Sequence, residues 1–178
     1  MINITVQSVL ALGLALLFVS AGSHKLRSAA RFHAQLAEYK LIPQGLVSPG
    51  GYLLAALELL LAPALLLPTT RPYAGLVAAG LLGLYGIAIA INLARGRDYI
   101  DCGCGDTPQL LSPWLLVRNG LLAGGALLTT LPAPTTGFAW SDLLIAVPAF
   151  LVVCLVYLVA EQLLENASVL REWSQLRD

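Results

Sequence analysis

Charged residues are scarce in this sequence. Only 11% of its 178 residues are Asp, Glu, Lys or Arg, whereas an ordinary globular domain carries about 25%. The ten basic and ten acidic residues cancel, and the basic ones are dispersed, which argues against a nucleic-acid-binding protein. The hydrophobic share is 58% and the mean hydropathy is +0.80. The composition therefore predicts an integral membrane protein whose excess apolar surface faces lipid.

Cysteine is also rare, and no cation precedes the first apolar run. Three cysteines are too few for a disulfide-stapled secreted scaffold. A secretory signal would begin with Lys or Arg and have a shorter apolar stretch. We therefore expect the first run to remain in the protein as a membrane span.

Long apolar runs are what the sequence has in abundance. Five of them approach the ~20 residues that a helix needs to cross a bilayer. They predict an all-α polytopic membrane bundle of about five transmembrane helices, in one integral membrane domain covering 1–178. Gly75, Ala79 and Gly83 recur at four-residue steps and favour close helix packing. The predicted spans are about 2–21, 50–67, 73–94, 113–131 and 140–160.

The longest connection, residues 24–49, is predicted to contain an amphipathic helix. Apolar residues recur there at three- and four-residue steps, at Ala29, Phe32, Leu36 and Tyr39, with polar residues between them. Such a helix is too short and polar to cross the membrane. Two placements stay open, one in the membrane interface and one as a soluble lid, and in both the helix covers one end of the bundle.

The distribution of basic residues predicts an orientation. Five spans place residues 24–49, the Cys102 region and the C-terminal tail on one face, with Arg71 the one basic residue on the other. The positive-inside rule then puts the N-terminus outside the cell (inner) membrane and the cysteines at its cytoplasmic face.

Ionisable residues inside apolar spans are costly and usually functional. Glu58 and Arg118 are such residues, and their depths from the cysteine-bearing face make a Glu58–Arg118 pair geometrically available. His24, Lys25, Asn92 and Asn119 are predicted at the same end. The sequence thus predicts a polar cavity beneath the cysteines, or a structural ion pair between two helices, and the two are compatible.

Cys102 and Cys104 stand one residue apart in a polar stretch. A disulfide across one residue closes a small, strained ring, which Gly103 accommodates, and strain favours exchange over a structural role. A neighbouring cation would favour the reactive thiolate. Two alternatives remain: idle thiols, or a soft-metal half-site completed by His24 and His33. Cys154, deep in the last span, is interpreted as a packing residue.

In order, these residues resemble the DoxX/MauE family, and its MauE branch of redox-associated membrane proteins in particular. The signature G-x-x-K-L matches Gly22 to Leu26. It is followed by an amphipathic stretch, Glu58, the Cys102–Cys104 motif and a span opening with Arg118 and Asn119. The resemblance covers roughly the first four spans. Gly105 departs from it, because the family often has Phe after the second cysteine.

The resemblance implies thiol–disulfide exchange with a thioredoxin-like protein. Cys102 and Cys104 would form the redox-active disulfide, with Lys25, Glu58, Arg118 and Asn119 around it. The resemblance also implies that the proteins it matures are exported. Exported substrates would favour an active face outside the cytoplasm, in conflict with the cytoplasmic face that the positive-inside rule predicts. The chain lacks the second cysteine pair that vitamin K epoxide reductase bundles use, which argues against a two-pair relay to quinone, and no other cofactor is implied.

Two rival functions stay open. One is a soft-metal transporter or chaperone, for a copper- or mercury-like ion, that uses the same thiols as an entry ligand. The other is a non-catalytic assembly subunit of a membrane complex. The sequence also leaves open the oligomeric state, the client and the direction of electron flow.

Overall fold

The computed structural model describes residues 4–102 and 110–132, together with scattered positions between 147 and 163. In these ranges the chain forms helices and no named strand, with one isolated bridge between Asp101 and Leu110. The predicted all-helical class is confirmed. The helices are α1 (Ile4–Arg27), α2 (Ala29–Glu38), α3 (Gln44–Leu66), α4 (Arg71–Ala94) and α5 (Pro113–Leu128).

Within the described ranges, three helices, α1, α3 and α4, are long and apolar enough to cross a membrane. The fourth predicted span corresponds to α5, which has 16 residues, and the fifth, 140–160, falls mainly outside the described residues. The structure therefore supports a membrane protein, while five remains a predicted number of spans. Helix α1 continues past its apolar run to Arg27, because the basic side chains of its last turn interact favourably with the helix dipole.

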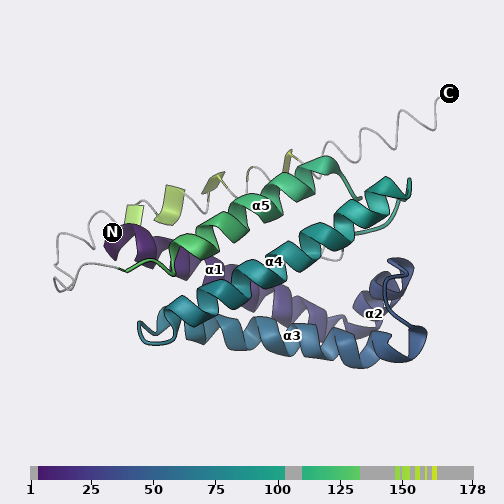
Figure 1. The fold of residues 1–178 in the computed structure, drawn as a ribbon, viewed down its shortest axis with the longest axis horizontal. Helices are drawn as coiled ribbons and strands as arrows, with labels where there is room; N and C mark the ends of the chain where they lie inside the picture. Colours follow the sequence, from purple (N-terminus) through teal and green to yellow (C-terminus); the bar gives the residue numbers. More distant parts are fainter. Residues whose placement is uncertain are drawn as a thin grey trace.

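The bundle consists mainly of two helix pairs, α1 with α3 and α4 with α5 (Figure 1). A tight connection at 67–70 joins α3 to α4. Phe18, Leu65 and Ala78 are fully buried in the core between the helices. Large apolar side chains such as Leu60 and Tyr73 face outward on α3 and α4. So much exposed apolar surface matches lipid rather than water.

Helix α2 covers one end of the bundle, beside the end of α3 where that helix begins (Figure 1). Its buried face reaches the segment that carries Cys102. Gln35 Nε2 donates to Asp101 Oδ2 at 2.5 Å, and the Tyr39 hydroxyl donates to the Cys102 carbonyl at 3.3 Å. The amphipathic helix predicted within 24–49 is therefore present, and it fixes the backbone at Cys102.

The other end of the bundle is closed by two polar side chains. Gln7 Nε2 donates to the carbonyls of Thr129 and Leu131, at 2.8 and 2.9 Å. Arg71 Nε donates to the Leu65 carbonyl at 3.0 Å. Carbonyls at helix C-termini lack partners within their own helix. Gln7 and Arg71 satisfy them, so both have structural roles there.

Candidate functional site

A buried ion pair joins α1 to α3. Lys25 Nζ lies 2.7 Å from Glu58 Oε1 and 2.8 Å from Oε2, so the ammonium contacts both carboxylate oxygens. The side chains are 5% and 1% exposed. Charges this deeply buried require a partner, because transfer out of water costs several kcal/mol for each ion.

The close approach of α1 and α3 explains why these two side chains meet. Gly22 lies against Ala55 and Leu59: a Cβ at position 22 would be 3.1 Å from the Ala55 carbonyl oxygen and 2.9 Å from Leu59 Cγ. Lys25 is one turn past Gly22 on α1, and Glu58 is one turn past Ala55 on α3, which runs in the opposite direction. Helical side chains lean toward the N-terminus of their own helix. Lys25 and Glu58 therefore lean toward each other.

We expect Gly22→Ala to lower the stability of the bundle. Alanine is the better helix former by about 1 kcal/mol, but its methyl group would force α1 and α3 apart, and overpacking typically costs about 1–3 kcal/mol. The measurement is the thermal unfolding midpoint in detergent. Gly13→Ala is the matched control on α1, because a Cβ there meets no atom of the described residues within 4 Å. Equal midpoints for the two variants would contradict this account of the α1–α3 contact.

Tyr85, on α4, is a site residue that the sequence did not predict. Its hydroxyl donates to Glu58 Oε1 at 2.7 Å. The Lys25 ammonium lies 5.4 Å from the Tyr85 ring centroid and 5.3 Å from that of Phe32, within cation–π range. A tyrosine within an apolar span was the only sequence signal. We call Lys25, Glu58 and Tyr85 the buried cluster.

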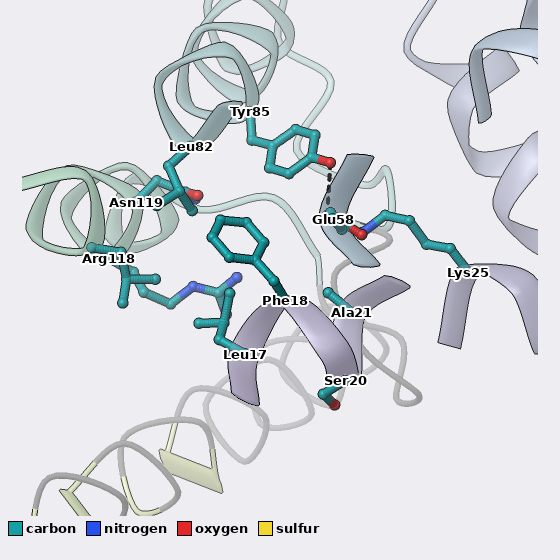
Figure 2. A pocket seen from close by; sticks show the side chains of 11 residues that line it. Leu17, Phe18, Ser20, Ala21, Lys25, Glu58, Leu82, Tyr85, Arg118 and Asn119 are labelled. Carbon is teal, nitrogen blue, oxygen red and sulfur yellow. Dashed lines mark hydrogen bonds and ion pairs between the residues drawn. The ribbon is translucent and has the colours of Figure 1, made fainter. Parts of the chain in front are cut away.

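The predicted Glu58–Arg118 pair is wrong. Lys25 and Tyr85 take the Glu58 oxygens, and in the view of Figure 2 the Phe18 ring lies between Arg118 and Glu58. Depth along the axis made the pair available, but depth does not determine which faces of two helices meet. Helix α3 packs mainly on α1, whereas α5 packs mainly on α4.

Arg118 nevertheless shares a cavity with the buried cluster. The space measures about 110 Å³ and is lined by Lys25, Glu58, Tyr85, Arg118 and Asn119, together with apolar residues of α1, α4 and α5 (Figure 2). The sequence predicted a polar cavity beneath the cysteines; this cavity has polar residues in its wall, but Cys102 is not among its described lining residues. Four of the predicted residues line it, and Tyr85 completes its polar wall.

A second cavity, of about 310 Å³, connects the buried cluster to Cys102. Lys25 and Tyr85 form part of its wall as well, and Cys102 forms another part. The remaining wall is mainly apolar. Cys102 is buried and takes part in a disulfide bond, while Cys104 and Cys154 lie outside the described residues. Cys102 therefore lies at the same end of the bundle as the cluster.

Tyr39 holds the Cys102 backbone through a phenol that stays protonated. Burial and the negative charge of Asp101 raise the pKa of Tyr39 above its ordinary value of 10.0. The hydroxyl therefore remains a donor to the Cys102 carbonyl at any physiological pH. The position of this carbonyl does not depend on a titration near neutrality.

The remaining predicted residues are two asparagines and two histidines. Asn92 is fully buried and Asn119 nearly so, and their amide nitrogens donate to backbone carbonyls of their own helices. His24 is half-buried in the last turn of α1. His33 packs edge-on against Tyr52, at 4.9 Å between centroids. Among the described residues no three His, Cys, Asp or Glu side chains group closely enough to hold a metal ion.

Comparison with known proteins supports the MauE part of the predicted resemblance. The family model described as methylamine utilisation protein MauE matches residues 4–132. The chain is 38% identical to the methylamine utilization protein MauE of Methylophilus methylotrophus over 88% of this chain and 85% of that protein. It is 36% identical to the Paracoccus versutus protein of the same name, over 84% and 82%.

A third relative, from Methylorubrum extorquens, is 45% identical over 62% of this chain and 60% of its own length. No solved structure matches the chain. The wider DoxX assignment is not shown by these matches. The family model spans α1 to α5, and thus the buried cluster and Cys102. The chain belongs to the MauE family of methylamine utilisation proteins.

Proposed function

We propose that this chain is a membrane thiol–disulfide exchange protein that works through Cys102 and Cys104 with a thioredoxin-like partner. The observation that carries the proposal is the position of Cys102: this disulfide-bonded residue lines a cavity that Lys25, the cation of the buried cluster, lines as well.

The exchange begins from the disulfide-bonded form. A thiolate of the partner attacks one sulfur of the Cys102–Cys104 disulfide, so one S–S bond forms and one breaks, and the other cysteine leaves as a thiolate. The partner's second thiolate then attacks the mixed disulfide. The partner leaves as a disulfide, oxidised by two electrons, and Cys102 and Cys104 remain as the reduced pair. In the reverse direction the chain reduces its partner.

The buried cluster supports the leaving thiolate. Lys25 lines the same cavity as Cys102, and a nearby cation lowers the free energy of a thiolate. Glu58 holds the Lys25 ammonium in place by accepting its hydrogen bonds, and Tyr85 in turn donates to Glu58. The role that the sequence gave to Glu58, positioning a cation, is thus kept in the proposal, with Lys25 as the cation.

The test of this proposal is the loss of exchange when the cysteines are replaced. We expect Cys102→Ser with Cys104→Ser to abolish disulfide exchange with thioredoxin, measured as mixed-disulfide trapping and thiol counting on the purified protein. Cys154→Ser is the matched control and should retain exchange. Exchange that persists in the double variant would remove the proposal.

We infer that the protein lies in the inner membrane, and its orientation can be measured on intact cells. Labelling of Cys102 and Cys104 on intact cells by a membrane-impermeant thiol reagent, before and after reduction, reports sidedness and redox state together. Labelling would place the pair outside, as exported clients require. Protection until the cells are opened would place it in the cytoplasm, as the charge rule predicts.

A further inference from the structure

The 310 Å³ cavity beside Cys102 is open toward the lipid-facing surface. Two of its wall residues, Leu53 on α3 and Leu84 on α4, are 70% and 54% exposed. Both lie on helices that can cross the membrane. Leu41 and Ile42, from the connection after α2, also belong to the wall and are exposed. A molecule dissolved in the bilayer can therefore reach the cavity between α3 and α4.

Among the described residues, four polar side chains line the cavity: Lys25, Gln35, Tyr39 and Tyr85. Three of them already donate hydrogen bonds to protein oxygens: Gln35 to Asp101, Tyr39 to the Cys102 carbonyl and Tyr85 to Glu58. The Lys25 ammonium has three N–H groups and makes two contacts to the Glu58 oxygens. Its third N–H is the donor that a ligand can use.

These features define the ligand chemically. It is apolar enough to come from the bilayer, carries a carbonyl oxygen for the Lys25 N–H, and reaches the sulfur of Cys102. A volume of about 310 Å³ is at the lower end of the range for small-molecule sites, ~300–1,000 Å³. A substituted ring fits this space, with its apolar tail extending past Leu53 and Leu84 into lipid. An acyl chain alone would leave the ammonium N–H without an acceptor.

We propose that this cavity binds a membrane quinone, which accepts the two electrons of the reduced Cys102–Cys104 pair. The inference rests on the proposed function, because it supplies the oxidant for the same cysteines. Two thiols lose two electrons and two protons and form the S–S bond, while the quinone gains both and becomes the hydroquinone. The sequence argued against a relay through two cysteine pairs. With Cys102 on the cavity wall, one pair is sufficient.

The test uses the purified full-length chain in phosphatidylcholine nanodiscs, reduced and then freed of reductant without oxygen. Decylubiquinone is added, its absorbance is followed, and free thiols are counted by mass after labelling. We expect one quinone reduced for every two thiols lost, with no mass gain from thiol addition to the ring. The Cys102→Ser, Cys104→Ser variant should show neither change.

A matched pair of variants locates the reaction. Leu53 and Leu60 lie on α3 and are similarly exposed, at 70% and 68%, but only Leu53 lines the cavity. We expect Leu53→Trp to block the entrance and slow quinone reduction by about tenfold or more, since small changes in pocket fit alter rates on this scale. Leu60→Trp should leave the rate unchanged. Leu60→Trp should also retain disulfide exchange with thioredoxin.

The outcomes separate the quinone site from the proposed exchange. A wild-type chain that exchanges disulfides with thioredoxin but does not reduce decylubiquinone would overturn the quinone site and leave the exchange standing. Equal rates in the two tryptophan variants would also overturn it. Cysteine-dependent quinone reduction without thioredoxin exchange would support the cavity and overturn the proposed partner.

Discussion

Replacing Glu58 by alanine should destabilise the bundle by about 3–5 kcal/mol, the usual cost of leaving one member of a buried ion pair without its partner. The Lys25 ammonium, 5% exposed, would lose both carboxylate contacts, and the Tyr85 hydroxyl would lose its acceptor. Lys25 would have to move toward the membrane surface to regain polar contacts. The measurement is the free energy of unfolding in mixed micelles, with the thermal midpoint as a second readout.

The double variant Lys25→Met, Glu58→Leu distinguishes a lost charge partner from lost packing. Removing both charges with apolar residues of similar volume is often neutral or stabilising, so this variant should recover most of the stability that Glu58→Ala loses. It should nevertheless exchange disulfides more slowly, because the cation beside Cys102 is gone. A Glu58→Ala protein that unfolds like the wild type would show that the pair contributes nothing to the fold.

Gly75→Ala should be the most damaging of the glycine-to-alanine substitutions on α4. A Cβ at position 75 would lie 2.5 Å from Thr129 Oγ1 and 2.8 Å from the Ala126 carbonyl oxygen. The carbonyl belongs to the backbone of α5 and cannot rotate away, so the helices must separate. Overpacking of this kind costs about 1–3 kcal/mol and sometimes more. The unfolding midpoint measures the effect, and Gly75→Leu should lower the midpoint further than Gly75→Ala does.

Gly80→Ala provides the matched control on the same helix. In the described part of the chain, a Cβ at Gly80 meets no atom within 4 Å, and alanine has the better helix propensity, by about 1 kcal/mol. The control should therefore be neutral or slightly stabilising. If Gly75→Ala and Gly80→Ala shift the midpoint equally, the contact between α4 and α5 at Thr129 does not explain why position 75 requires a glycine.

The family signature at the end of α1 can now be explained by two physical roles. Its glycine, Gly22, permits the close approach of α1 to α3. Its lysine, Lys25, lies one turn after Gly22 on α1 and pairs with Glu58 on α3. Neither role is sufficient alone, because the ion pair depends on the distance that the glycine sets. The three residues form one structural unit, which the matched family model covers in full.

The sequence was a good guide wherever a property depends on local composition. Apolar runs predicted the helices that can cross a membrane, and the three- and four-residue steps predicted α2. Of the two glycines in the small-residue stripe, however, only Gly75 is tightly packed. Among the described residues, a Cβ at Gly83 would meet no atom within 4 Å. The four-residue spacing places both glycines on related faces of α4, but the neighbour that requires a glycine is supplied by α5.

What the sequence determined by itself was the lipid-facing helical class and the presence of buried charges and cysteines at one end, because hydropathy and span length depend on the local chain. The pairing of those groups was decided only by the tertiary structure. The position of Glu58 along the bundle axis would have allowed a pair with Arg118. Instead α1 packs closely on α3 through Gly22, and this contact places Lys25 beside Glu58. Which helix faces meet depends on side chains from distant parts of the chain, and a one-dimensional pattern does not contain that information.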